Sequence, residues 1–152
     1  MNSTADVVVI GGGVMGASTA FRLAERGLKV TLVEKSFLAG GTTGKSSAIV
    51  RQHYSNETTA RMALFALSIF QNFAEATGGE CGYMPVGFVV LASANDREGL
   101  AANVAMQQSV GINTRLLSAE EIREIAPGMA QCKTVLNKKA FLFVHKCQNT
   151  VF

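Results

Sequence analysis

Apolar residues in the first 34 positions follow the order strand, turn, helix and strand. The run at Val7–Ile10 is aliphatic throughout, which is typical of a parallel strand buried on both faces. A glycine turn and an amphipathic helix come next, and Gly27 is well placed to end that helix. The predicted helix carries an apolar stripe made of Ala17, Ala20, Phe21 and Ala24. A second strand at Val30–Val33 completes a predicted βαβ unit.

Beyond this unit, a polar loop leads into a long helix. Residues 35–55 are rich in glycine, serine and threonine, which favours a loop with accessible backbone N–H groups. Residues 56–77 have one wide apolar face, and Gly78 and Gly79 stop the predicted helix. A plain nicotinamide-type domain would instead deliver a third parallel strand soon after the second. The chain therefore leaves the first sheet for a different layer.

The remaining pattern predicts short alternating elements. We expect a strand over residues 86–91, a helix over 95–110 and a short strand over 114–117. The spacing of Ser118 and Glu121 is that of a capping box, which opens another helix. The order of the elements indicates an α/β fold without internal repeats.

The glycine turn after the first strand has the chemistry of a dinucleotide site. Gly11, Gly13 and Gly16 form G-x-G-x-x-G, in which the glycines allow a tight turn, a close pyrophosphate and a closely packed helix. The N-terminus of the following helix points N–H groups and a positive dipole at phosphates. Glu34 ends the second strand and can accept both adenosine ribose hydroxyls, while its charge disfavours a 2′-phosphate. The strand, helix and acid together support an ADP-containing dinucleotide. The alternative is a βαβ unit whose glycines serve only packing.

Charge and cysteine content change this picture little. The net charge of +3 comes from four lysines in residues 131–152, which contain no acid, whereas residues 1–130 carry ten Lys/Arg and eleven Asp/Glu. Nothing in residues 1–130 predicts a nucleic-acid surface. No apolar run has the length of a membrane-spanning helix, and no secretion signal is visible, so we expect a cytoplasmic protein. Three cysteines without C-x-x-C spacing indicate free thiols.

Three further stretches carry a resemblance to a known family. They are the loop AGGTTGKSSAIVRQHYS at residues 39–55, the phrase VGFVVL at 86–91 and the segment at 117–128. With residues 11–34 they resemble the FAD-dependent amine and amino-acid oxidases, which include glycine oxidase, sarcosine oxidase and D-amino-acid oxidase. The resemblance runs from residue 5 to residue 129, roughly the first third of such an enzyme. It implies a Rossmann-type FAD-binding βαβ with a flavin loop (1–55), then a helix and the beginning of an α+β substrate domain (56–129).

The resemblance also implies roles for individual residues. The candidate cofactor-binding residues are Gly11, Gly13, Val14, Met15, Gly16, Glu34, Lys35, Thr42, Thr43, Lys45, Ser46 and Ser47. Arg51 would lie near the isoalloxazine, where a positive charge favours the reduced anion. Several relatives carry a flavin-linking histidine where this chain has Gly44, so noncovalent FAD is expected. As alternatives, Arg51 is an ion-pair residue, Lys45 a solvated loop charge and His53 a packing histidine.

The family reaction is oxidation of a C–N bond by hydride transfer to flavin N5. We therefore expect a small secondary amine or amino acid, such as sarcosine or glycine, as the substrate. Three alternatives remain open. They are an FAD enzyme acting on a hydroxy acid or glycerol phosphate, a noncatalytic nucleotide-binding subunit of a larger flavoprotein, and a nicotinamide-dependent dehydrogenase.

From Met129 onward the expected family pattern stops. Residues 130–152 are basic and contain Cys132 and Cys147, which suggests a frameshift or a misjoined segment, or alternatively a genuine tail for a second subunit. Either way, we expect the 152 residues alone to be catalytically inactive. A metal cluster of Cys132, His145 and Cys147 is not predicted, because these ligands are few and oddly spaced.

Overall fold

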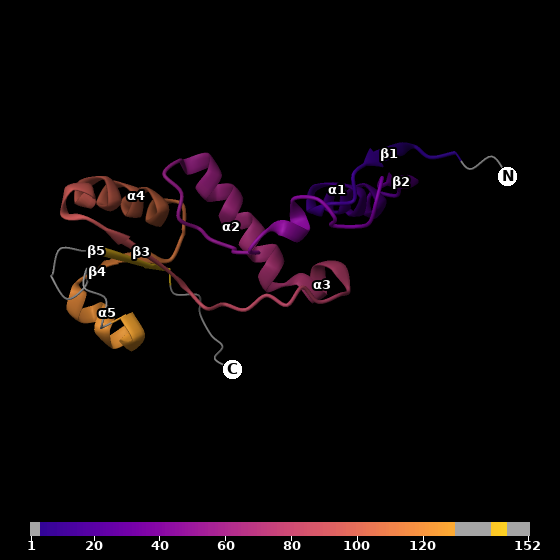
Figure 1. The fold of residues 1–152 in the computed structure, drawn as a ribbon. Coiled ribbons are helices and arrows are strands. Elements are labelled where there is room, and N and C mark those ends of the chain that lie inside the picture. The colour runs from indigo at the N-terminus through magenta and orange to yellow at the C-terminus, as the bar shows by residue number, and fades with distance from the viewer. Residues whose placement is uncertain (1–3, 130–140, 146–152) are drawn as a thin grey trace. The chain divides into compact units, whose positions relative to one another are not determined.

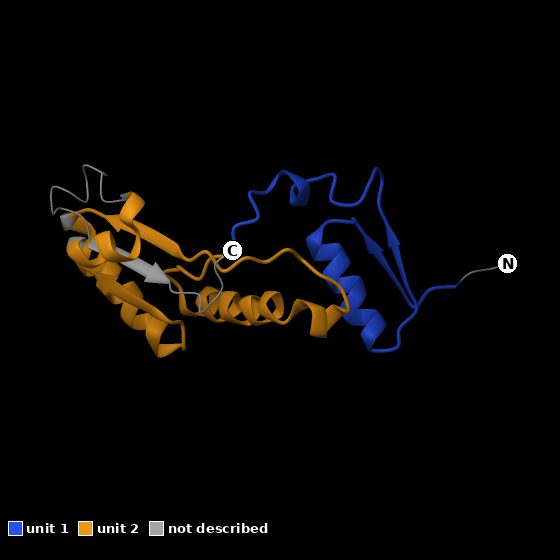
Figure 2. Ribbon diagram, turned by 90° about the horizontal axis from the view of Figure 1, so that it is seen from below, with its two compact units in different colours: residues 1–49 blue, residues 50–152 orange. Residues whose placement is uncertain are grey.

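The computed structural model describes residues 4–129 and 141–145 (Figure 1). The chain divides into two compact units, Met1–Ile49 and Val50–Phe152, which Figure 2 shows in different colours. The sequence pattern placed the end of the nucleotide-binding region a few residues later, after residue 55. All candidate cofactor-binding residues lie in unit 1, whereas Arg51 lies in unit 2.

Unit 1 is the predicted βαβ unit. Strand β1 (Val7–Ile10) pairs in parallel with β2 (Val30–Val33), and helix α1 (Val14–Glu25) connects them. A short 3-10 turn, η1 (Thr43–Lys45), follows in the loop. The three main elements lie where the hydrophobic pattern predicted them. The α/β fold class is confirmed.

The expectation that β1 is buried on both faces is wrong for this unit. Val7 and Val9 are half-buried, whereas Val8 and Ile10 are 58% and 87% exposed. The described residues of unit 1 form a two-stranded sheet with one helix on it. Successive side chains of β1 therefore alternate between a covered and an open face. Aliphatic side chains alone therefore do not establish that both faces of a strand are covered.

Unit 2 begins with two helices where one was predicted. Residues 56–77 form α2 (Glu57–Gln71) and the short α3 (Phe73–Thr77). Asn72 separates them with φ −115° and ψ 33°, and its side-chain Nδ2 donates to the carbonyl oxygen of Ser68 at 2.8 Å. A side chain that bonds to a carbonyl of the preceding turn competes with continuation of the helix. The apolar pattern could not show this break, because it continues through position 72.

A three-stranded antiparallel sheet forms the rest of unit 2. Its strand order is β3 (Phe88–Ala92), β5 (Phe141–His145) and β4 (Thr114–Leu117). Strand β3 lies slightly later than the predicted strand at residues 86–91. Its central strand, β5, belongs to the segment in which no element was predicted. Residues 130–140 and 146–152, including Cys132 and Cys147, lie outside the described residues.

Helices flank this sheet. After η2 (Ala94–Asp96), α4 (Arg97–Ser109) runs along the sheet, and Figure 1 shows α4 and α5 (Ala119–Ile125) on either side of the strands. The predicted capping box is present at the start of α5, which is followed by η3 (Pro127–Met129). None of the helices in the described part of the chain is long and apolar enough to cross a membrane.

The apolar core of unit 2 has two small clusters. One contains Ala60, Val110 and Ile112, with Tyr54, Leu64 and Met106 packed against them. The other contains Leu100 and Val104, with Val90 and Ala92 packed against them. The first cluster packs α2 and the end of α4 against Tyr54. It therefore holds in place the segment that also contains Arg51.

Candidate dinucleotide-binding site

The outer glycines of the predicted fingerprint are required by the observed backbone. Gly11 has φ +108°, a left-handed conformation that side chains disfavour. A Cβ placed on Gly16 would lie 1.8 Å from the carbonyl oxygen of Gly11. Helix α1 therefore starts directly against the turn, and only glycine at position 16 permits this approach.

The N-terminal end of α1 has features that suit the binding of an anion. Its N-cap, Gly13, has no side chain to cap the helix, and no acidic residue occupies the first turn. The hydroxyl of Thr43 accepts a hydrogen bond from the Val14 N–H at 3.0 Å. The loop after β2 is thus held at the positive end of the helix dipole, 29 positions along the chain. Three of the candidate cofactor-binding residues, Thr43, Val14 and Gly13, therefore lie together.

Both carboxylate oxygens of Glu34 are anchored by backbone N–H groups. Oε2 accepts from Gly12 at 2.8 Å, and Oε1 accepts from Ser36 at 3.0 Å. These bonds, the Gly12 bond first, lower the pKa of Glu34 below its ordinary value. The group is therefore an oriented carboxylate at neutral pH. Its remaining lone pairs can accept hydroxyl donors such as those of a ribose.

Gly12 is a site residue that the fingerprint did not identify. It is buried, and a Cβ there would lie 2.6 Å from Leu38 Cδ2 and 3.2 Å from Glu34 Cβ. The motif treats position 12 as variable, so its only sequence signal was a third consecutive glycine. A side chain at this position would push the exposed Leu38 side chain aside and crowd the acid that the Gly12 N–H holds.

The loop after β2 closes back onto the glycine turn. The N–H of Ala39 donates to the Gly12 carbonyl at 2.9 Å, and the N–H of Gly44 donates to the Ala39 carbonyl at 2.9 Å. Ala39 adopts φ +61°, and a Cβ on Gly44 would lie 2.5 Å from the Ala39 oxygen. No side chain, including a histidine, fits at position 44 in this backbone.

The other candidate residues line the outside of the same unit. Val14 and Met15 are 58% and 77% exposed at the start of α1. The remaining exposed candidates are Lys35, Thr42, Lys45, Ser46 and Ser47. Their basic and hydroxyl groups, the helix start without an acidic residue and the oriented Glu34 fit the pyrophosphate and ribose of an ADP group.

Arg51 and its neighbours form a separate arrangement in unit 2. The Arg51 guanidinium carbon lies 5.2 Å from the centre of the Tyr54 ring, a cation–π distance. No salt bridge among the described residues involves Arg51. Burial lowers the pKa of His53, so its imidazole is neutral at neutral pH.

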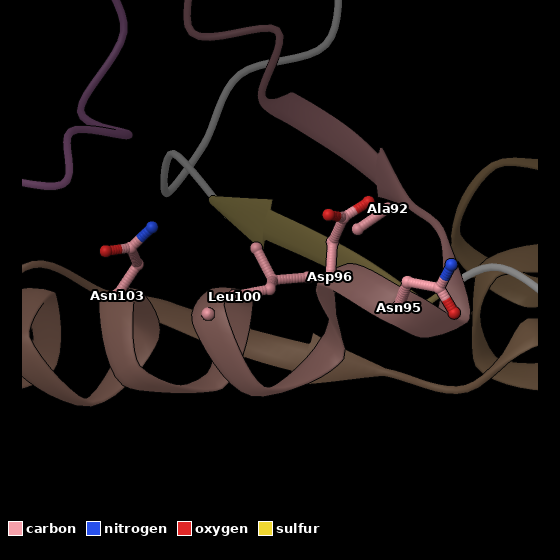
Figure 3. A pocket seen from close by; sticks show the side chains of 6 residues that line it. Ala92, Asn95, Asp96, Leu100 and Asn103 are labelled. Atoms are coloured by element: carbon pink, nitrogen blue, oxygen red, sulfur yellow. The ribbon is translucent and has the colours of Figure 1, made fainter.

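Another hollow lies beside β3 and the start of α4 (Figure 3). It has a volume of about 380 Å³ and is lined by Ala92, Asn95, Asp96, Gly99, Leu100 and Asn103. Asp96 in this hollow already accepts a hydrogen bond from the Ser93 hydroxyl at 2.6 Å. None of the sequence-predicted site residues lines it. Within residues 4–129 and 141–145, no group of three or more potential metal ligands is present.

Comparison with known proteins identifies the family. Residues 6–146 match the family described as DAO, FAD dependent oxidoreductase. This match continues beyond Met129, so the predicted end of the resemblance there was wrong. The chain is 29% identical over 125 residues to sarcosine oxidase subunit beta from Rhodobacter capsulatus, covering 80% of this chain and 30% of the relative. It is 35% identical over 135 residues to anaerobic glycerol-3-phosphate dehydrogenase subunit A1 from Haloferax volcanii, covering 86% and 22%.

A solved structure shows the same arrangement of elements. L-proline dehydrogenase from P. horikoshii superposes with a TM-score of 0.82 and 26% identity, covering 96% of this chain and 38% of that protein. The chain thus spans well under half of the proteins it resembles. Because this family is FAD-dependent, the dinucleotide is FAD. The alternative of a nicotinamide-dependent dehydrogenase is therefore set aside. The chain belongs to the DAO family of FAD-dependent oxidoreductases.

Proposed function

We propose that this chain supplies the nucleotide-binding front part of an enzyme that oxidises the C–N bond of a small secondary amine or amino acid, such as sarcosine or glycine. The observation that carries the proposal is the Glu34 carboxylate, fixed by two backbone N–H groups beside a glycine turn and a helix start with no acidic residue in its first turn. The similarity to a sarcosine oxidase subunit and to an L-proline dehydrogenase supports an amine or amino acid as the substrate.

Within unit 1, each part of the nucleotide has a set of residues that would hold it. The N–H groups of the turn and of the first residues of α1 would bind the pyrophosphate, and Glu34 would accept the ribose hydroxyls. Thr42, Thr43 and residues 45–47 would contact the phosphates and one ring edge. Binding would be noncovalent, because Gly44 has no room for a linking side chain.

When held by these residues, FAD would supply the two-electron redox chemistry needed to oxidise the C–N bond. The chain's own contribution is binding, orientation and electrostatics. Arg51 would place a positive charge near the ring, held against Tyr54. Groups that bind the substrate would lie in the part of such an enzyme that this chain does not cover, so we expect the 152 residues alone to be inactive.

A second candidate function keeps FAD and replaces the amine with glycerol phosphate. It is favoured by the 35% identity to a glycerol-3-phosphate dehydrogenase subunit. Both relatives are named as subunits, which supports a second chain as a partner. A reducing, cytoplasmic compartment is proposed because Cys81 is an exposed free thiol.

The test is a titration of the purified chain with FAD, followed by flavin fluorescence. We expect saturable binding that Glu34→Gln weakens, whereas equal binding by both proteins would contradict the assigned ribose contact. The loaded protein is then mixed anaerobically with sarcosine, glycine or glycerol 3-phosphate. Flavin bleaching by an amine would contradict the expected inactivity while supporting the amine proposal, and bleaching by glycerol 3-phosphate alone would replace the proposal with the second candidate.

A further inference from the structure

Gln107 is a fully buried polar residue that the proposed function leaves unexplained. It lies on α4 with 0% of its surface exposed. Its side-chain Nε2 donates to the carbonyl oxygen of Tyr54 at 2.7 Å and lies 3.2 Å from Nδ1 of His53. Both amide hydrogens are therefore directed at one short segment, more than 50 positions earlier in the chain.

The roles of the atoms in this contact are determined by their neighbours. Because Nε2 donates to a carbonyl oxygen, it must be the nitrogen end of the amide. The neutral imidazole of His53 can then accept the second hydrogen at Nδ1. The opposite atom, Oε1, is buried and has no hydrogen-bond partner among the residues that the structure describes. An apolar side chain of the same size would avoid that unpartnered oxygen, so the donor end of the amide is the useful feature.

The segment that Gln107 holds carries Arg51. The backbone carbonyl of Tyr54 accepts a hydrogen bond from Gln107. The centre of the Tyr54 ring lies 5.2 Å from the guanidinium carbon of Arg51. A guanidinium on a long side chain has many rotamers, and stacking on a fixed ring restricts them. We infer that Gln107 is the positioning residue for Arg51, acting through Tyr54. The role of Arg51 at the flavin rests on the proposed function, whereas the positioning itself does not.

The test measures the position of Arg51 directly in the chain by NMR. The Tyr54 ring should shift the Arg51 side-chain resonances upfield, and Tyr54→Leu should abolish that shift. Gln107→Met keeps the length and removes both donors, so we expect it to abolish most of the same shift. The matched control is Gln108→Met, because Gln108 also bonds a backbone carbonyl, that of Thr114 at 2.7 Å, and lies on the same helix. Gln108→Met should leave the Arg51 resonances unchanged.

Several results would overturn the inference. It fails if folded Gln107→Met retains the Arg51 shift, or if Gln108→Met loses it equally. If Gln107→Met does not fold, Gln107→Leu tests the same loss, because a leucine side chain has no donor. Should neither variant fold, the wild-type side-chain amide of Gln107 is compared with that of exposed Gln71. Protection from exchange at Gln107 is expected, and exchange as fast as at Gln71 would refute the contact.

A second readout separates this inference from the proposed function. In the FAD-loaded chain, Arg51→Met should lower the reduction potential of the flavin, and Gln107→Met should lower it less. If Arg51→Met shifts the potential and Gln107→Met does not, positioning by Gln107 is refuted. If neither shifts it while the NMR signal is lost, Gln107 still positions Arg51, and the placement of Arg51 at the flavin is wrong.

Discussion

The two units build their candidate sites in different ways. In unit 1, the contacts come from backbone N–H groups of a glycine turn and from an acid 22 positions away, which one strand–helix–strand passage brings together. In unit 2, a glutamine side chain on α4 reaches a segment 53 and 54 positions earlier. Spacing along the sequence determines the first arrangement. Tertiary packing determines the arrangement in unit 2, so no local sequence motif predicts it.

The largest expected effect tests the backbone-built site. Gly16→Ala places a Cβ 1.8 Å from the Gly11 carbonyl oxygen, and neither backbone group can move without separating α1 from the turn. We expect the free energy of unfolding of unit 1 to fall by about 3 kcal/mol, with loss of FAD binding. Urea unfolding followed by circular dichroism measures the first effect, and flavin fluorescence measures the second.

Gly41→Ala is the matched control in the same unit. A Cβ at position 41 meets nothing within 4 Å, so stability and FAD binding should remain near wild type. Equal losses in both variants would mean that the close approach of Gly16 to the Gly11 carbonyl is not the cause of the effect.

A smaller effect on nucleotide binding is expected from loss of the Glu34 charge. Glu34→Gln removes the carboxylate that accepts two N–H groups, and we expect the affinity for ADP to fall about tenfold. Glu25→Gln is the control, because it removes the same charge from an exposed pair with Arg22 on α1. Isothermal titration with ADP compares the two. A similar loss in both would indicate a general electrostatic effect.

Glu34 also makes a directional prediction about pH. Its folded pKa lies below the ordinary 4.5, chiefly because of the Gly12 N–H bond, whereas the unfolded carboxyl titrates near that value. The stabilisation is therefore complete above pH 4.5 and disappears as the pH falls through the lower folded pKa. Urea midpoints recorded across this range should fall less steeply in Glu34→Gln than in wild type. Parallel curves would contradict the assignment.

Two buried glutamines of unit 2 should respond with opposite signs. Both side-chain polar atoms of Gln52 are buried without a partner in the described part of the chain, so Gln52→Met should raise the free energy of unfolding by about 1 kcal/mol. Gln107→Met removes two satisfied donors and should lower it by about 1 kcal/mol. Urea unfolding of both variants provides an internal comparison. If both changes had the same sign, side-chain volume would outweigh hydrogen bonding at these positions.

Elements governed by neighbours in sequence could be predicted, and those governed by distant contacts could not. The pattern gave β1, α1 and β2, the glycines and Glu34, because each depends on local spacing. It gave one helix for α2 and α3, since apolar periodicity does not register the side chain of Asn72. It missed β5, whose pairing with β3 and β4 depends on strands far away in the chain. Gln107 appeared to be one polar residue among others on a helix.

The smallest expected effect concerns strain in the loop that closes unit 1. Ala39 has φ +61°, which costs an L-residue about 1 kcal/mol, whereas glycine adopts it freely. Ala39→Gly also increases the entropy of the unfolded chain, which offsets part of this gain, so we expect unfolding to become harder by about 0.5 kcal/mol. Ala24→Gly in α1 is the control with ordinary helical geometry, and it should cost about 1 kcal/mol. Because the Ala39 N–H bonds to Gly12, whose own N–H holds Glu34, a loss of stability in Ala39→Gly would show that rigidity of this loop contributes more to the site than relief of strain does.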